Sequence, residues 1–289
     1  MIDLGRVGIW SGQLRTADLA DAADAAAELE GLGYGAIWLP GREPDDLEER
    51  VRALLEPTAR VVVATGIVSI WTHPAAETAA LHARLAADFT GRFLLGVGVS
   101  HAPVVAGAGR RYRRPLVAMN EYLDRLDAAE RPVPKSERVI AALAPRMLEL
   151  ARERAWGSHP YLVSPEHTRR ARAILGPGAL LAPEQKVVLE TDPDSARAIA
   201  RKALEPYLRL PNYVNNLLRT GFTREDVENG GSDRLVDGLV AWGDAETILE
   251  RIGEHQAAGA DHVSIQVVRD DRTLPRAEWR RLASSLRAT

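Results

Sequence analysis

Short β-branched apolar runs alternate with amphipathic, alanine-rich segments along the whole chain, and this alternation limits the possible folds more than any other feature. Buried strands that alternate with helices are typical of a parallel sheet covered on both faces. We predict eight such strands, at residues 7–10, 36–39, 61–70, 93–99, 139–143, 159–163, 186–190 and 261–268. Eight strand–helix units in 289 residues favour a closed (β/α)8 TIM barrel of the α/β class.

An open, doubly wound sheet is the main alternative to a barrel. A dinucleotide-binding sheet of that kind carries Gly-x-Gly-x-x-Gly after its first strand, and the Trp-Ser-Gly-Gln-Leu sequence at 10–14 lacks that pattern. The alternation continues without a linker, which predicts one domain over 1–289. A long connection at about 209–241, with Thr223 and Asp226 as a helix cap, predicts a helical insertion between strands seven and eight that covers one barrel mouth.

Composition and short motifs exclude several classes of protein. The chain has no cysteine, so disulfides, thiolate metal sites and cysteine nucleophiles are excluded. A net charge of −3 argues against general affinity for nucleic acid or for anionic membranes. The apolar runs are too short to cross a bilayer and the amino terminus lacks a signal-peptide core, so we expect a cytoplasmic protein. The motifs His-x-His, His-Glu-x-x-His and Gly-x-Ser-x-Gly are missing, which disfavours metal-dependent and serine hydrolases.

The carboxyl ends of the strands form the working face of a barrel, so the residues after each strand are the candidates for chemistry. Four of the seven histidines, at 73, 101, 159 and 167, lie in or beside these loops. Histidine suits proton transfer near neutral pH, although loops often contain histidine for other reasons. The other residues at this face are Ser11, Gly12, Arg42, Glu43, Ser69, Trp71, Thr72, Ser100, Ala144, Pro145, Arg146, Gly157, Ser158, Tyr161, Thr191, Asp192 and Arg269.

Three stretches, at 27–39, 64–98 and 243–262, resemble the luciferase-like oxidoreductase family in their content and order. The most specific runs from Ala-Thr-Gly-Ile-Val at 64–68 through His-Pro-Ala at 73–75 to Gly-Arg-Phe-Leu-Leu-Gly-Val-Gly at 91–98. Segments 98–103 and 159–167 are most similar to the branch that uses the deazaflavin coenzyme F420. The resemblance implies hydride transfer between bound coenzyme F420 and a small organic substrate, in a homodimer.

Two other functions stay open under the same resemblance. One is a monooxygenase that uses reduced flavin mononucleotide (FMN) and oxygen, and the other is a non-catalytic protein that binds the flavin or deazaflavin. An aldolase or isomerase on a generic barrel would need a Schiff-base lysine or a metal cluster. Lys186 opens its predicted strand, away from the working face, while Lys135 and Lys202 lie in a loop and a helix. That option therefore has little support.

The resemblance also implies which residues hold the coenzyme. Strand three should end in a bulge with a non-prolyl cis peptide at Gly66-Ile67-Val68, followed by Ser69, that supports the coenzyme ring. The alternative is that Gly66 only relieves crowding in the barrel. Loop amides and helix starts after strands five and six should hold the phosphate, through Ala144, Pro145, Arg146, Gly157, Ser158 and His159. Relatives often carry glycines where Leu143 and Ala144 stand, and a plain helix start with a surface arginine is the alternative.

His101 stands where some deazaflavin relatives have an acid after strand four. It is our candidate catalytic residue, as a proton donor to the substrate during hydride transfer. The alternatives are that it bonds the coenzyme ring or lines the pocket. Trp71, Tyr213 and Asn216 are the candidates for contact with the substrate. The alternative for the last two is a tyrosine that packs a helix and an asparagine that caps one. The arginines around Tyr112, at 110, 111, 113 and 114, form either a dock for an anionic coenzyme tail or a solvated surface.

Overall fold

One curled parallel sheet organises the computed structural model, which describes residues 2–41 and 46–286. The strands follow the order β7-β6-β5-β4-β3-β2-β1-β10-β8-β9, and every pairing between neighbours is parallel. The predicted α/β class with parallel strands is confirmed. The strands are β1 (Val7–Trp10), β2 (Ala36–Gly41), β3 (Val62–Ser69), β4 (Phe93–Gly98), β5 (Arg138–Ile140), β6 (Gly157–Ser158), β7 (Leu180–Leu181), β8 (Glu184–Val188), β9 (Val240–Trp242) and β10 (Val263–Val267).

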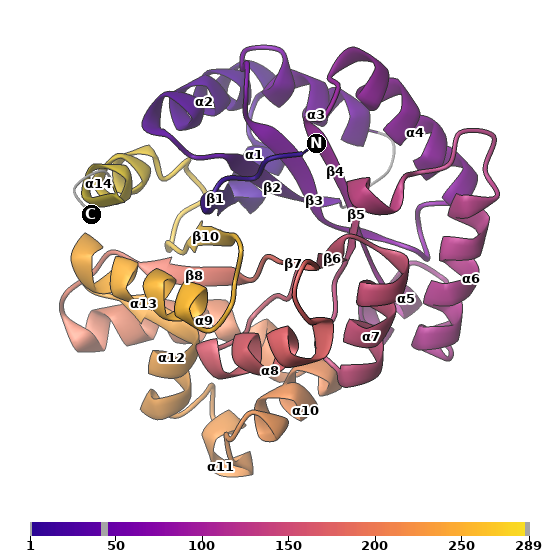
Figure 1. The fold of residues 1–289 in the computed structure, drawn as a ribbon. Helices are drawn as coiled ribbons and strands as arrows, with labels where there is room; N and C mark the ends of the chain where they lie inside the picture. The colour runs from indigo at the N-terminus through magenta and orange to yellow at the C-terminus, as the bar shows by residue number, and fades with distance from the viewer. Residues whose placement is uncertain (1, 42–45, 287–289) are drawn as a thin grey trace.

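Helices surround the curled sheet on its outer side (Figure 1). Several begin and end where the sequence supplies a cap: Asp18 accepts a hydrogen bond at the start of α2, and Gly33 ends it in the left-handed conformation. The helices are α1 (Gly12–Thr16), α2 (Leu19–Leu32), α3 (Leu47–Leu55), α4 (Ala75–Asp88), α5 (Ala102–Gly107), α6 (Pro115–Asp127), α7 (Pro145–Arg154), α8 (Pro165–Leu175), α9 (Pro193–Leu208), α10 (Pro211–Arg219), α11 (Arg224–Val227), α12 (Asp233–Leu239), α13 (Ala245–Ala257) and α14 (Arg276–Leu286), with a 3-10 turn η1 (Lys135–Glu137).

Alternate residues of each strand enter different parts of the core. Ile37 and Leu39 on β2 join the large apolar cluster that includes the helices, whereas Trp38 between them joins a smaller cluster made mainly of strand residues. This separation follows from the period of two along a strand, which turns successive side chains to opposite faces. The concave side of the sheet is therefore filled with side chains, with Trp38 completely buried there.

The segment from β7 to β8 contacts both ends of the curled sheet. β7 pairs with β6, and β8 pairs with β10. Between these two strands, the Ala182 amide donates to the Ser158 carbonyl (3.0 Å), and the Ser264 amide donates to the Pro183 carbonyl (3.0 Å). Pro183 has no N–H, which explains why the strand is interrupted at this point.

Two predicted strands need correction, and two strands were not predicted. The strand expected at 159–163 lies instead at 157–158, because the chain turns at Pro160 and Leu162 adopts a left-handed φ of 58°. The strand expected at 186–190 begins at 184 and ends at 188. Strands β7 and β9 were not predicted, since runs of two or three residues are too short to show the alternation of a strand.

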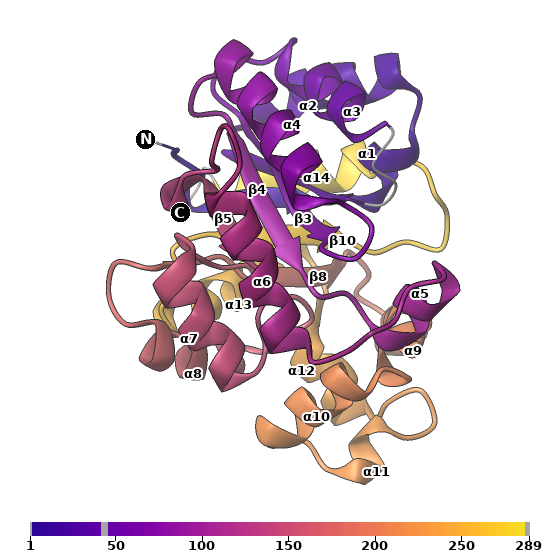
Figure 2. The same ribbon diagram turned by 90° about the vertical axis from the view of Figure 1, so that its right-hand side faces the viewer.

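The long connection at about 209–241 forms α10, α11 and α12, which Figure 2 shows at one end of the molecule. Its predicted cap is confirmed, since Thr223 and Asp226 form a reciprocal capping box at the start of α11. The segment packs on α9 through an apolar cluster that includes Leu204, Leu217 and Leu235. No helix among the described residues is both long and apolar enough to span a bilayer.

Candidate functional site

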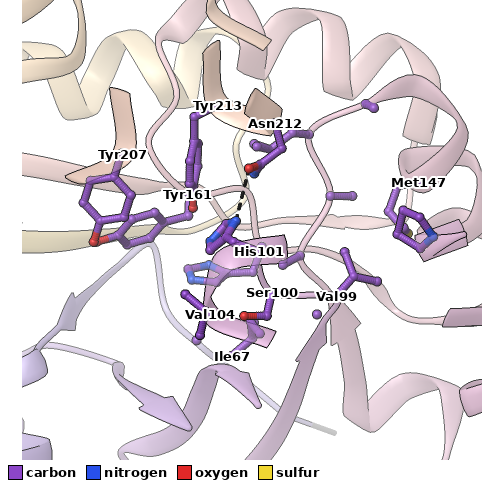
Figure 3. A pocket seen from close by; sticks show the side chains of 18 of the residues that line it. Ile67, Val99, Ser100, His101, Val104, Met147, Tyr161, Tyr207, Asn212 and Tyr213 are labelled. Carbon is purple, nitrogen blue, oxygen red and sulfur yellow. Dashed lines mark hydrogen bonds between the residues drawn. The ribbon is translucent and has the colours of Figure 1, made fainter. Parts of the chain in front are cut away.

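A cavity of about 700 Å³ opens at the carboxyl ends of the strands. Trp10, Ile67 and Gly98 line it from β1, β3 and β4, and the loop after β5 lines it at 141–144. Helix α10 supplies the facing residues Asn212, Tyr213, Asn215 and Arg219. In Figure 3, Tyr161, Tyr207 and Tyr213 gather on one side of the cavity and Met147 stands on the other. Among the described lining residues, Arg219 alone carries a formal charge at neutral pH.

The structure divides the predicted site residues into two groups. Those that line the cavity are Gly66, Ile67, His101, Ala144, His159 and Tyr213. Those outside the lining are Val68, Ser69, Trp71, Pro145, Arg146, Gly157, Ser158 and Asn216. Two of the four loop histidines do not reach the cavity, because His73 bonds the Ser69 carbonyl and His167 bonds the Leu143 carbonyl. Arg42 and Glu43 lie outside the described residues.

The bulge at the end of β3 brings main chain to the cavity. The Gly66–Ile67 peptide is cis, and the register of β3 shifts against both neighbouring strands. This is the backbone geometry that the family resemblance implied. A Cβ atom on Gly66 would lie 2.6 Å from Trp10 Nε1 and 3.0 Å from His159 Nε2. Only glycine therefore fits at this position without movement of its neighbours.

His159 is a neutral hydrogen-bond acceptor at the cavity. Its Nδ1 lies 2.7 Å from the Ala182 carbonyl oxygen, which can only accept, so the ring proton is on Nδ1 and Nε2 keeps its lone pair. Burial lowers the His159 pKa to about 3, and its ring stacks on Trp38 with centroids 4.0 Å apart. Among the described residues, neither His159 Nε2 nor Trp10 Nε1 has a hydrogen-bond partner. Two buried polar atoms without partners thus flank Gly66.

His101 occupies the N-cap position of α5 without a side-chain cap, and its ring reaches across to α10. Its Nδ1 lies 3.1 Å from Asn212 Oδ1 (Figure 3), so Nδ1–H donates and Nε2 keeps a lone pair. The His101 ring also packs against Tyr213, with centroids 5.2 Å apart. Burial lowers the pKa of His101, and the bond to Asn212 opposes part of that shift. His101 is therefore mainly neutral at pH 7, and its Nε2 lone pair is the position at which it can take up a proton.

The residues predicted to hold a phosphate are placed unevenly. Ala144 lines the cavity as the N-cap of α7, without a side-chain cap, while Arg146 is exposed. Gly157 and Ser158 stabilise the pairing of strands in the sheet. A Cβ on Gly157 would lie 1.9 Å from the Leu180 carbonyl oxygen, and the Ser158 hydroxyl donates to the Ile140 carbonyl. Sequence reasoning missed Arg219, because the end of α10 is distant in sequence from the strand ends.

The predicted substrate-side residues also differ in position. Tyr213 lines the cavity, whereas Asn216 is buried one helical turn away, outside the lining. The Trp71 indole donates to the Val99 carbonyl (2.7 Å) and packs against Tyr112, with ring centroids 5.7 Å apart. Tyr112 itself lines the cavity. Trp71 therefore supports the lining from behind. The arginines at 110, 111, 113 and 114 are exposed around Tyr112.

A buried polar network adjoins the tyrosines, and it corrects our view of Lys186. Lys186 Nζ bonds Glu184 Oε1 (3.0 Å) and Gln266 Oε1 (3.1 Å), and lies 3.8 Å from the centre of the Tyr161 ring. Since Tyr161 and Gln266 line the cavity, Lys186 lies directly behind its lining rather than away from the working face. Glu184 and Lys186 share one face of β8 because they are two residues apart, but the predicted strand began at 186 and left Glu184 out.

Parallel strands in a curled sheet, with a ligand-sized cavity at their carboxyl ends, define a barrel-like α/β protein. The luciferase-like monooxygenase family model matches residues 2–262, and the chain belongs to that family. This confirms the resemblance recognised in the sequence. Members of the family are oxidoreductases or monooxygenases, which supports an enzymatic role. No curated protein shows significant sequence similarity to the chain.

Solved structures of similar fold include users of both coenzymes. An F420-dependent secondary alcohol dehydrogenase, solved with an F420–acetone adduct, has 15% identity, a TM-score of 0.74 and 98% coverage of both chains. An F420-dependent tetrahydromethanopterin reductase from Methanopyrus kandleri has 15% identity and a TM-score of 0.69, covering 97% of this chain and 98% of the other. The oxygenating constituent of 3,6-diketocamphane monooxygenase from Pseudomonas putida, with FMN, has 13% identity, a TM-score of 0.70, and coverages of 97% and 96%. These identities establish likeness of fold alone.

Proposed function

We propose that this protein is an oxidoreductase that holds coenzyme F420 in the cavity and exchanges a hydride between it and a small organic substrate. The observation that carries the proposal is the cavity of about 700 Å³ with main chain at Gly66 on one wall. Its volume suits a flat coenzyme and a small second molecule. The partnerless atoms Trp10 Nε1 and His159 Nε2 beside Gly66 also fit a ring system with polar edges.

The chain's own residues would have separate tasks. Gly66 and Ile67 would support the ring, and Ala144 at the start of α7 would hold the phosphate with its helix amides. The coenzyme, when bound, supplies or accepts the hydride. His101 would take the accompanying proton on Nε2 during substrate oxidation and return it during reduction, while Asn212 keeps its ring oriented.

The choice of F420 over FMN rests on the resemblance and on the exposed arginines around Tyr112, which suit an anionic tail. An FMN-dependent monooxygenase is the second candidate, favoured by the similar fold of the FMN-bound diketocamphane enzyme. A coenzyme-binding protein without turnover is the third. These three functions share the same cavity and differ in what it binds and whether the bound group reacts.

Titration with each coenzyme tests the proposal. Purified full-length protein is titrated with F420 and with FMN while the fluorescence of the coenzyme is followed. We expect saturable binding of F420 and substrate-dependent change in its redox state. Saturable binding of FMN alone, with oxygen consumption once it is reduced, would support the monooxygenase. Binding without turnover over a broad substrate panel would support the third function, and binding of neither coenzyme contradicts all three.

We further propose that the curled sheet is a (β/α)8 barrel. Its seventh strand would run from β7 through β8, since Ala182 and Pro183 bond to the strands on either side. Residues at about 209–241 would then form the insertion before the eighth strand, β10, with α10 over the mouth. A homodimer and a cytoplasmic location stay predictions, and light scattering after size exclusion measures the first.

A further inference from the structure

The polar network behind the tyrosines has forced hydrogen-bond directions. Lys186 Nζ can only donate, so the atom of Gln266 that faces it at 3.1 Å must be the amide oxygen. The Tyr161 hydroxyl lies 2.9 Å from the same oxygen and must also donate to it. Because the Tyr161 hydroxyl proton is used in the bond to Gln266, the Tyr207 hydroxyl, 2.9 Å away, donates to the Tyr161 oxygen. Each step leaves one possible orientation.

The Glu184–Lys186 pair holds this network in place. Both residues are at most 2% exposed, and Glu184 Oε2 accepts the Leu162 amide at 3.1 Å. Burial raises the pKa of Glu184, while Lys186 and the Leu162 amide oppose that shift. Lys186 stands level with Gln266 in the pairing of β8 with β10. The register between β8 and β10 therefore places the Lys186 ammonium group beside the Gln266 amide oxygen.

The consequence concerns the other end of the Gln266 amide. With Oε1 occupied by two donors, Nε2 presents its two N–H groups, and Gln266 lines the cavity. Among the described residues, no hydrogen bond of Nε2 is found. The rest of this wall is aromatic, since Tyr161, Tyr207 and Tyr213 pack with ring centroids 5.3–6.4 Å apart. The wall thus combines aromatic rings, tilted by 51–88° to one another, with an oriented amide donor.

We infer that this wall selects a largely apolar substrate with a carbonyl-type acceptor, which binds Gln266 Nε2–H, and that Lys186 is the positioning residue for that amide. A wall that donates a hydrogen bond to the substrate discriminates against a molecule of the same shape that cannot accept a hydrogen bond. The inference rests on the proposed function in one respect: the coenzyme ring lies against Gly66 and leaves the tyrosines to the substrate.

Acetophenone and α-methylstyrene test the inference because they share a shape and differ in C=O against C=CH2. Their dissociation constants are measured by isothermal titration calorimetry with full-length protein and no coenzyme. For Gln266→Leu we expect acetophenone binding to weaken about three- to tenfold, the value of one hydrogen bond, with α-methylstyrene binding unchanged. Equal effects on both probes, no effect on either, or no binding of either probe to the wild type overturns the inference.

A second variant tests the role of Lys186. Glu184→Gln combined with Lys186→Met removes both buried charges together, so neither is left unpaired. Without Lys186 the Gln266 amide can rotate. We expect acetophenone binding to weaken, but less than in Gln266→Leu, and the circular dichroism spectrum to stay unchanged. An unchanged preference between the two probes overturns the positioning role. Gln256→Leu, on α13 and outside the cavity lining, is the matched control and should bind both probes as the wild type does.

These experiments can fail separately from the proposed function. The two probes are titrated without coenzyme, so failure of F420 and FMN to bind leaves their preference measurable. Conversely, normal coenzyme binding with no preference between the probes contradicts the inference about Gln266 alone. The two outcomes therefore identify which of the two proposals is wrong.

Discussion

Gly66 is the residue at which the smallest change should have the largest effect on the site. A methyl group there would lie 2.6 Å from Trp10 Nε1 and 3.0 Å from His159 Nε2, and His159 is held by its bond to Ala182. Overpacking of this kind costs about 1–3 kcal/mol, so we expect Gly66→Ala to weaken coenzyme binding by about tenfold or more. Fluorescence titration measures the change.

Gly31→Ala is the matched control for that substitution. A Cβ on Gly31 meets nothing within 4 Å, and the residue lies inside helix α2. We expect this change to raise the free energy of unfolding by about 0.5–1 kcal/mol and to leave coenzyme binding unaltered. If both alanine variants bind the coenzyme like the wild type, crowding at Gly66 does not shape the site.

His101 gives a prediction about turnover rather than binding. His101→Phe keeps a ring beside Tyr213 but removes the nitrogen that would carry the proton. We expect kcat to fall about 10²- to 10⁴-fold, as for loss of general acid–base catalysis, with the coenzyme dissociation constant nearly unchanged. Stopped-flow absorbance of the coenzyme measures the hydride step directly. A variant with wild-type kcat would leave His101 as a lining residue only.

At this scale, sequence reasoning found residues that follow a strand directly and missed those that depend on pairing register. His101 was predicted because it follows a recognisable strand, and Gly66 and His159 were predicted from the family resemblance; all three line the cavity. Gln266 was missed, although it lies within a predicted strand, because its role depends on standing level with Lys186. Only long-range pairing places these two side chains together.

At the scale of elements, the capping box of α11 provides a test of the segment that carries α10 to the cavity. The Thr223 side chain accepts from the Asp226 amide, and the Asp226 carboxylate accepts from the Thr223 amide. Loss of an N-cap costs about 0.5–2 kcal/mol, so we expect Thr223→Ala to lower Tm by a few degrees. Thr223→Ser keeps the hydroxyl and should retain the wild-type Tm in calorimetry. Equal Tm values for alanine and serine would show that the cap adds no stability.

The elements were predictable in proportion to their length and periodicity. Strands β1 to β4 have regular patterns and lie within about two residues of the positions that the sequence indicates. β6, β7 and β9 have two or three residues each, and pairing with neighbours rather than local propensity makes them strands. Their positions therefore depend on contacts that a single sequence does not reveal.

For the whole molecule, buried histidines predict how stability depends on pH. Burial lowers the pKa of His255 to about 3, and it lowers the pKa of His167 and His262 to about 4. Below the ordinary pKa near 6.5, the unfolded chain binds protons that these buried rings do not. Stability should therefore rise with pH from about 4 to 6.5 and be lost as the pH falls through that range.

Calorimetry at stepped pH measures this dependence. Each such histidine contributes roughly 1 kcal/mol per pH unit, so we expect Tm to fall steeply between pH 6.5 and 5. His255→Gln removes one contributor, whose ring bonds Thr168 and Gln185, and should flatten the slope while lowering Tm at pH 7. A Tm that stays constant from pH 7 to 5 would show that protonation of these rings does not change the free energy of unfolding.

The contact between His101 and Asn212 spans 111 residues of sequence and joins the loop after β4 to helix α10 across the cavity. A molecule seated between them would act as a temporary cross-link between an early and a late part of the chain. Ligands that fill the cavity should then protect the α10 region from trypsin, in proportion to their concentration relative to the dissociation constant. Limited digestion thereby becomes a screen for substrates that requires neither turnover nor a chromophore.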